Sequence, residues 1–243
     1  GNINNALLCL LSLILLFAPL FIQNKFAITL PSGLEITIYF FIFAAEILGE
    51  INNFYGIIPY WDTILHTING FLAAAVGFSL IDLLNKNSKN VNLSPFYLCL
   101  VAFCFSMTIG VLWEFFEYSS DKFFDMDMQK DTVVKKISSV TLNPSGKNKA
   151  IVVSSIGKTV IYDENGYILE TIDGGYLDIG LNDTMKDLLV NFIGAVVFCS
   201  FAYLALKQNK KNNFIDKFIP TKEKRPMASS VIKEIEDRKE LVK

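Results

Sequence analysis

Trp61-Asp62-Thr63-Ile64-Leu65-His66 begins an apolar run that continues to about residue 84. On a helix, the side chains of Asp62 and His66 lie on one face, one turn apart. His66 is the only histidine in the chain. Ionisable groups at the edge of a membrane segment are costly and usually functional. The run therefore predicts a membrane helix whose first two turns carry chemistry.

The composition indicates a membrane protein with several spans. Of the 243 residues, 52% are hydrophobic and 19% are charged, and the charges cluster between apolar runs. Soluble domains of this length are rarely so apolar. The net charge of −2 says little about partners, and the chain has no basic groove with interleaved aromatic residues, so no nucleic-acid partner is predicted.

The cysteines are predicted to be small buried hydrophobic residues rather than disulfides or a zinc site. No CxxC motif is present, and all four fall inside apolar runs. They are Cys9, Cys99, Cys104 and Cys199.

The expected fold is an all-α integral membrane protein with about five transmembrane helices. The predicted spans are residues 5–22, 34–50, 61–84, 95–118 and 181–206. The first resembles the apolar part of a signal peptide, but its length, Pro19 and the lack of a basic start favour a retained helix. Small residues at 70–75 and at Gly77 predict close helix packing in the third span.

Residues 119–180 are expected to form a small β-rich insert outside the membrane. The segment is polar and contains β-prone runs at 150–153, 159–162 and 167–169. Asp163-Glu164-Asn165-Gly166 predicts a hairpin with a type I′ turn. The predicted division is therefore four spans in residues 1–118, the insert in 119–180, the fifth span in 181–206 and a charged tail in 207–243, helical towards its end.

Lysines in short loops indicate the cytoplasmic side. Lys25, Lys86 with Lys89, and the cluster at 207–211 fall on one side, whereas the loop 52–60 contains no lysine or arginine. The expectation is a multi-pass protein of the cell membrane with its N-terminus outside and its tail in the cytoplasm. The insert also contains lysines, but long segments translocate largely regardless of charge, so it is expected to be extracytoplasmic.

Alternation of the spans brings four pairs of ionisable residues to one side of the membrane. Each layer takes one residue from each of four helices, and the layers are about 5–6 Å apart. The shallower layer is Glu50, Asp62, Glu117 and Asp183, and the deeper one is Glu46, His66, Glu114 and Asp187. So many carboxylates cannot all stay ionised and unpaired, and Lys186 is the one cation near these helix ends.

A bound divalent metal, Mg²⁺, Mn²⁺, Ca²⁺ or iron ahead of Zn²⁺, would resolve this crowding. The candidate metal ligands are Asp62, His66, Glu114, Glu117 and Asp187. The candidate catalytic residues are the same five with Asp183, and Glu46 and Glu50 are further candidates. Protonation of some acids in a proton relay would also relieve the crowding, as would carboxylates that cap helix ends and bond to the insert.

Several of these residues also have plain structural interpretations. Glu50 and Asp183 lie at interfaces, and Asp183 fits a helix N-cap. The aromatic residues Trp61, Trp113 and Tyr118 fit an interfacial belt. Close helix packing explains Asn191 and Gly194.

Four motifs in order resemble the YjdF-like family of uncharacterised bacterial inner-membrane proteins over residues 34–202. They are Leu48-Gly49-Glu50, Trp61-Asp62-x-x-Leu65-His66-x-x-x-Gly70, Trp113-Glu114-x-x-Glu117 and Asp183-Thr184-x-x-Asp187-Leu188-x-x-Asn191-x-x-Gly194-Ala195. The second and last also look like the VanZ-like family, more loosely, since that family has Glu-x-x-Gln where this chain has Glu114-x-x-Glu117. The resemblance implies a multi-pass bacterial membrane protein and supplies no reaction.

Three functions fit these observations. The first is metal-assisted hydrolysis or transfer on a lipid or lipid-linked substrate at the outer leaflet. The second is a proton- or cation-coupled transporter, although the spans lack acidic or basic residues between His66 and Asp82 and between Pro95 and Glu114 for a long relay. The third is a sensor or scaffold whose insert binds an extracytoplasmic partner.

Overall fold

The computed structural model describes residues 3–26, 28–88, 92–208 and 221–222, and most of them are helical. The expected helical end of the tail lies outside these residues. In the described part, four helices are long and apolar enough to cross a membrane: α1, α4, α5 and α6. The helices are α1 (Ile3–Phe26), α2 (Ser32–Ile42), the π-helix η1 (Phe43–Ile51), α3 (Phe54–Ile57), α4 (Trp61–Asn87), α5 (Pro95–Phe124) and α6 (Leu181–Gln208).

The second expected span is formed by two helices, α2 and η1, which follow one another without a break. From Phe43 the backbone changes to the wider π pattern, which is rare and often occurs at functional sites. The indole N–H of Trp61 donates to the carbonyl oxygen of Ala44, 3.3 Å away, within this π segment. Trp61 therefore ties η1 to the start of α4, in addition to its expected place at the interface.

The fourth helix is longer than expected, because α5 continues past Tyr118 to Phe124. Asp125 then ends it in the left-handed conformation, with φ 51°. Residues 119–124, assigned to the insert from the sequence, thus belong to the helix. The segment contains no glycine or proline, so nothing in it stops the helix at the predicted boundary.

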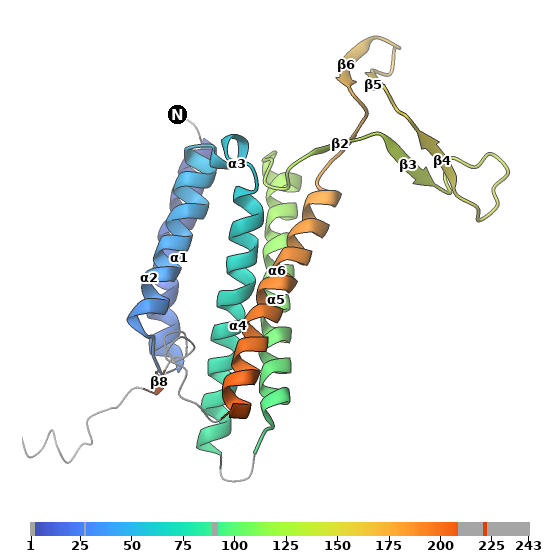
Figure 1. The fold of residues 1–243 in the computed structure, drawn as a ribbon. Helices are drawn as coiled ribbons and strands as arrows, with labels where there is room; N and C mark the ends of the chain where they lie inside the picture. Colours follow the sequence, from blue (N-terminus) through green and yellow to red (C-terminus); the bar gives the residue numbers. More distant parts are fainter. Residues whose placement is uncertain (1–2, 27, 89–91, 209–220, 223–243) are drawn as a thin grey trace, which may run out of the picture.

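Helices α4, α5 and α6 form a three-helix bundle, and α1 packs with α2 and η1 beside it (Figure 1). Two glycines bring α4 and α6 into backbone contact. A Cβ at Gly70 would overlap the carbonyl oxygen of Asn191, and one at Gly194 would overlap that of Thr67. Below these contacts the core is apolar, with Ala74, Ala75, Phe78, Leu98, Cys99, Ala102, Ala195, Phe198 and Ala202.

The helix ends that carry the paired ionisable residues lie at the same end of the molecule, as the sequence predicts. In Figure 1 the start of α4, the end of α5, the start of α6 and α3, which follows η1, all lie at the upper end of the molecule. At the lower end, β1 (Ile28–Thr29) pairs with β8 (Thr221–Lys222), so the described part of the tail lies opposite.

The insert consists of three antiparallel strand pairs that extend away from the helices (Figure 1). The pairs are β2 (Thr132–Val134) with β7 (Tyr176–Asp178), β3 (Lys136–Ser139) with β4 (Ile151–Ser154), and β5 (Lys158–Tyr162) with β6 (Ile168–Asp173). The predicted hairpin between β5 and β6 is confirmed.

The type I′ turn predicted for that hairpin is wrong. In the turn, Gly166 has a positive φ and Asn165 does not, whereas type I′ requires both. The carboxylate of Asp163 accepts from the backbone N–H groups of Asn165 and Tyr167. This local side-chain bonding stabilises a longer loop instead.

None of the four cysteines forms a disulfide, as predicted, but only some are buried. Cys99 is buried and Cys199 is half-buried, whereas Cys9 and Cys104 lie exposed on outer helix faces. The prediction of burial is wrong for these two, because an apolar run in a membrane helix contains lipid-facing positions as well as core positions.

Candidate functional site

His66 lies where α4, α5 and α6 converge at their clustered ends. Its Nε2 is 3.3 Å from Asp62 Oδ1, one turn earlier on α4, and 3.9 Å from Asp187 Oδ2 on α6. Its Nδ1 is 3.9 Å from Glu114 Oε1 on α5. The imidazole is about nine-tenths buried. One ring thus faces carboxylates from three helices, with a different set at each nitrogen.

The surrounding residues form two groups that share His66. The first is Asp62, His66 and Asp187, and the second is His66, Glu114 and Glu117. In each group, one ligand atom per residue lies within 4.8 Å of the others. These five residues are the set that the sequence suggested for a metal, and a metal-binding role stays a prediction.

The first group is already neutralised by a lysine. Lys186 Nζ lies 3.1 Å from Asp62 Oδ2 and 3.6 Å from Asp187 Oδ1. It also lies 3.2 Å from Asp183 Oδ1. A cation on α6 therefore compensates the carboxylates on the Nε2 side of His66.

The second group has no such cation. Within the described part of the chain, no lysine or arginine pairs with Glu114 or Glu117. Glu114 is 4% exposed, and neither of its oxygens has a hydrogen-bond partner of normal geometry among the described residues. Buried polar groups almost always have a hydrogen-bond partner, so a buried carboxylate without one calls for an explanation.

Glu117 is oriented by its own helix. The indole N–H of Trp113 donates to Glu117 Oε1 at 2.8 Å, one turn away on α5. Trp113 was interpreted from the sequence as an interfacial belt residue, and its contact with Glu117 was missed. The i,i+4 spacing of the two residues is the signal that could have found it.

Asp183 lies outside both groups and is held by two donors. Its Oδ2 accepts from the backbone N–H of Lys130 at 2.8 Å, and its Oδ1 faces Lys186. The N-cap interpretation is wrong, because α6 begins at Leu181 and Asp183 lies inside its first turn. Its carboxylate instead connects α6 to Lys130 and Lys186. A catalytic role for Asp183 stays untested.

Glu46 and Glu50 on η1 also lie outside the two groups. Glu46 is 3% exposed, and its Oε2 has no hydrogen-bond partner among the described residues. The ring of Tyr55 lies against Gly49 on η1, and Lys130 Nζ lies 6.0 Å from its centroid. Burial, together with the carboxylates of Glu50 and Asp62, raises the pKa of the Tyr55 phenol. The phenol therefore stays protonated, and Tyr55 is a further residue that the sequence did not reveal.

Residues 125–130, which we call the cap segment, follow α5 at the end of the bundle that contains the site. The carboxylate of Asp121 accepts from the backbone N–H groups of Met128 and Gln129, at 2.6 and 2.9 Å. The side-chain amide of Gln129 donates to the hydroxyl of Thr184 on α6. With the bond from Lys130 to Asp183, these contacts join the end of α5 to the start of α6 over the acidic residues.

Below Asp187 the polar character ends within a few turns. Asn191 Oδ1 accepts from Asn69 Nδ2 at 3.1 Å, and the Asn191 amide lies 3.5 Å from the carbonyl oxygen of Ser106. The next layer contains Phe71, Phe78 and Phe198, whose rings pack edge to face. Packing thus accounts for Asn191, as the sequence analysis expected.

Comparison with known proteins places the chain in a membrane family. Residues 2–208 match the family described as "Predicted membrane protein (DUF2238)". An uncharacterised protein of Thermotoga maritima is 29% identical over 115 residues, which are 47% of this chain and 58% of the relative. The match thus spans less than two thirds of that relative's length. No solved structure matches, and nothing in these comparisons supports the looser VanZ-like resemblance. Because the family match covers most of its length, this chain belongs to the DUF2238 family of predicted membrane proteins.

Proposed function

We propose that His66, Glu114 and Glu117 bind a divalent cation at one end of the helical bundle. The observation that carries the proposal is Glu114, a buried carboxylate with two unpartnered oxygens facing an imidazole nitrogen. A cation between these groups would supply the missing partner and offset the two carboxylate charges.

The surroundings of His66 favour Nδ1 as its ligand atom. Asp62 Oδ1 lies 3.3 Å from Nε2, so a neutral imidazole would keep its proton on Nε2, facing this carboxylate. Its lone pair would then be on Nδ1, the atom that faces Glu114. A carboxylate behind a ligating histidine is the usual way to fix its tautomer and orientation. Trp113 has the same orienting effect on Glu117.

The chemistry supported by such a site is metal-assisted hydrolysis or transfer on a lipid-linked substrate. Three protein ligands leave coordination positions for water and substrate, as in catalytic rather than structural sites. The metal would polarise an ester or phosphate and activate water, and Lys186 adds a positive charge nearby. The donor set suits Mn²⁺, Mg²⁺, Fe²⁺ or Zn²⁺. The YjdF-like resemblance supports a bacterial membrane setting and adds no reaction.

The proposed orientation places the acidic end and the insert outside the cell and the tail in the cytoplasm. Its support is the lysine bias of the short loops. A transporter is less well supported, because the apolar layer around Phe78 and Phe198 follows directly below Asn191 and offers no polar route inward.

The insert offers a surface for an extracytoplasmic partner, as the sequence suggested. Tyr167, Ile168 and Leu169 at the β5–β6 hairpin are 73%, 63% and 64% exposed. Isolated two-stranded ribbons are marginally stable in water, so a partner that covers this tip would stabilise it. Replacing Ile168 and Leu169 by serine would then abolish pull-down of that partner from cell-envelope extracts and leave metal binding intact.

A metal-binding measurement tests the main proposal. Purified protein stripped with a chelator is titrated with Mn²⁺, and bound Mn²⁺ is followed by electron paramagnetic resonance. We expect one tight ion per chain for wild type and at least a tenfold weaker affinity for Glu114→Gln. The control is Asp82→Asn, a buried aspartate that pairs with Lys86 at the far end of α4. Wild type that binds Mn²⁺ no more tightly than Glu114→Gln would refute the site.

A further inference from the structure

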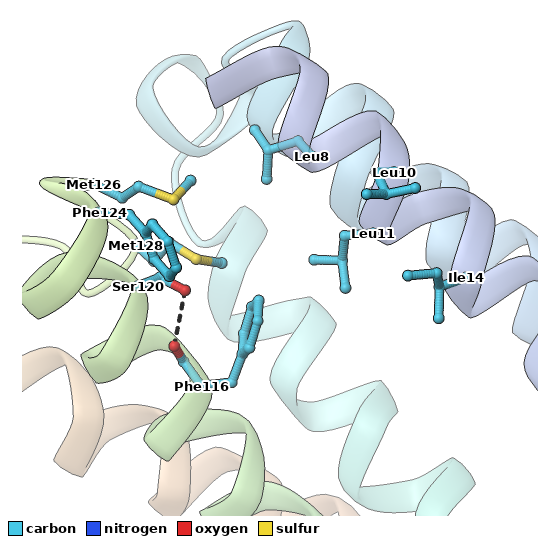
Figure 2. Close-up of a pocket in the computed structure, with 9 residues that line it drawn as sticks. All are labelled: Leu8, Leu10, Leu11, Ile14, Phe116, Ser120, Phe124, Met126 and Met128. Atoms are coloured by element: carbon cyan, nitrogen blue, oxygen red, sulfur yellow. Dashed lines mark hydrogen bonds between the residues drawn. The ribbon is translucent and has the colours of Figure 1, made fainter. Parts of the chain in front are cut away.

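A hollow of about 200 Å³ lies between α1 and the end of α5, and we call it the α1–α5 cleft. Figure 2 shows Leu8 and Leu11 extending from α1 towards Phe116 and Met128 on the opposite wall. Its lining residues are Leu8, Leu10, Leu11, Ile14, Phe116, Ser120, Phe124, Met126 and Met128.

The lining of the cleft is almost wholly apolar. The hydroxyl of Ser120 is its one polar side-chain group, and this hydroxyl donates to the carbonyl oxygen of Phe116 at 2.9 Å (Figure 2). No hydrogen-bond donor of the lining side chains is therefore left for a polar occupant. Most of the lining comes from α1 and α5, which are long and apolar enough to cross a membrane. In a bilayer, a hollow between two such helices would open onto hydrocarbon.

The cleft and the acidic site are both bordered by the end of α5 and by the cap segment. Glu117 lies between Phe116 and Ser120 in the sequence, within one turn of both, and is 8% exposed. The cap segment supplies Met126 and Met128 to the cleft, and Asp121 holds its backbone over the end of the bundle. The site is therefore only partly screened at this end, where the Lys186 side chain stays 46% exposed, and an apolar hollow lies beside the turn of α5 that carries Glu117.

We propose that the α1–α5 cleft binds one acyl chain of a phospholipid, which reaches the acidic site sideways from the membrane. The chain lies against Leu11 and Phe116, and the phosphate-bearing headgroup lies at the Glu117 end. A phosphate is the substrate group that a carboxylate-bound divalent cation attracts most directly. The headgroup part of this proposal rests on the metal site above, whereas the acyl-chain part does not.

Photolabelling in a defined bilayer tests the acyl-chain site. The protein is placed in nanodiscs of phosphatidylcholine and phosphatidylglycerol that contain a small fraction of phospholipid with a diazirine in one acyl chain. After irradiation, labelled peptides are quantified by mass spectrometry. We expect peptides with residues 8–14 and 116–128 to be labelled several-fold more than those with Leu189 and Ile193, which are 59% and 45% exposed on α6.

Two matched variants on α1 separate a site from ordinary lipid contact. Leu11→Trp fills the cleft and should reduce labelling of residues 116–128 at least threefold. Leu20→Trp adds the same side chain at an exposed position that does not line the cleft and should leave this labelling unchanged. Both variants are first checked for a single monodisperse peak in gel filtration.

The outcomes distinguish this proposal from the metal site. Even labelling of all outward helix faces, or no difference between Leu11→Trp and Leu20→Trp, would overturn the acyl-chain site, even if wild type binds Mn²⁺. Concentrated labelling that Leu11→Trp removes would support it, even if wild type binds no Mn²⁺. Leu11→Trp should keep the Mn²⁺ affinity of wild type. Leu11 is on α1, whereas the proposed ligands are on α4 and α5.

Discussion

The two halves of the α4–α5–α6 bundle are built from the same three helices but bury different kinds of side chain. The half near the insert, which we call the acidic half, buries His66, Glu114, Glu117 and Asp187. The other, the apolar half, buries alanines together with Phe78 and Phe198. Buried acidic groups are thus concentrated at one end. At the other end close packing dominates, and the buried Asp82 is paired with Lys86.

This difference indicates that one half of the bundle stabilises the helix packing and the other is suited to binding. In a membrane, helices associate through packing and hydrogen bonds, because lipid offers no hydrophobic driving force between them. The apolar half and the glycine contacts hold the helices at fixed distances. The acidic half can then keep an uncompensated carboxylate such as Glu114, an arrangement that is unfavourable for stability and suited to binding.

The largest expected effect is at the boundary between the halves, where Gly194 lies against the backbone of α4. In Gly194→Leu, the new side chain would overlap the carbonyl oxygen of Thr67 and force the helices apart. The expected loss of stability is more than about 4 kcal/mol, with aggregation in gel filtration. Gly157→Leu is the control, because nothing lies within 4 Å of a Cβ there. A folded, monodisperse Gly194→Leu protein would contradict the close contact.

A smaller loss is expected from a cavity in the apolar half. Phe198 is 1% exposed, and its ring packs edge to face on Phe71 and Phe78. Phe198→Ala should lower the free energy of unfolding by about 3 kcal/mol, since the surrounding helices relax only in part. Thermal unfolding in detergent measures this loss. Phe201→Ala, on the same helix but 49% exposed, should lose far less.

In the acidic half, Lys186 is expected to be stabilising. Lys186→Met would leave the carboxylates of Asp62 and Asp187 without their nearest cation. The expected loss is about 1–2 kcal/mol, less than for a fully buried pair because the lysine side chain is 46% exposed and screened by solvent. Lys147→Met, at an exposed lysine of the insert, is the control and should lose under about 0.5 kcal/mol in the same thermal assay.

The sequence predicted the helices well and the contacts poorly, for physical reasons. Long apolar runs fix where helices form, because no other structure satisfies the backbone in lipid. Alternation of the spans brings the ends with Asp62, Glu114 and Asp187 together whatever the side-chain details. The sequence does not determine that Lys186 lies on the Nε2 side of His66, nor that the cap segment is hydrogen-bonded to both α5 and α6. These depend on rotation of the helices and on contacts from 121 to 129 and from 130 to 183.

The smallest expected effect is the change in stability caused by Glu114→Gln. Its sign should depend on Mn²⁺, unlike that of a substitution in the apolar half. Without metal, Glu114→Gln should stabilise the protein by about 1 kcal/mol, because it removes a buried charge that has no partner and keeps the shape of the side chain. With Mn²⁺ at a hundred times its dissociation constant, wild type should gain about 2.7 kcal/mol that the variant lacks, and the order should reverse. Unfolding is measured for both proteins with chelator and with Mn²⁺. A conservative change in the apolar half, such as Phe198→Leu, should destabilise equally in both conditions. If Glu114→Gln were also destabilising by the same amount with and without Mn²⁺, Glu114 would be a packing residue like those of the apolar half.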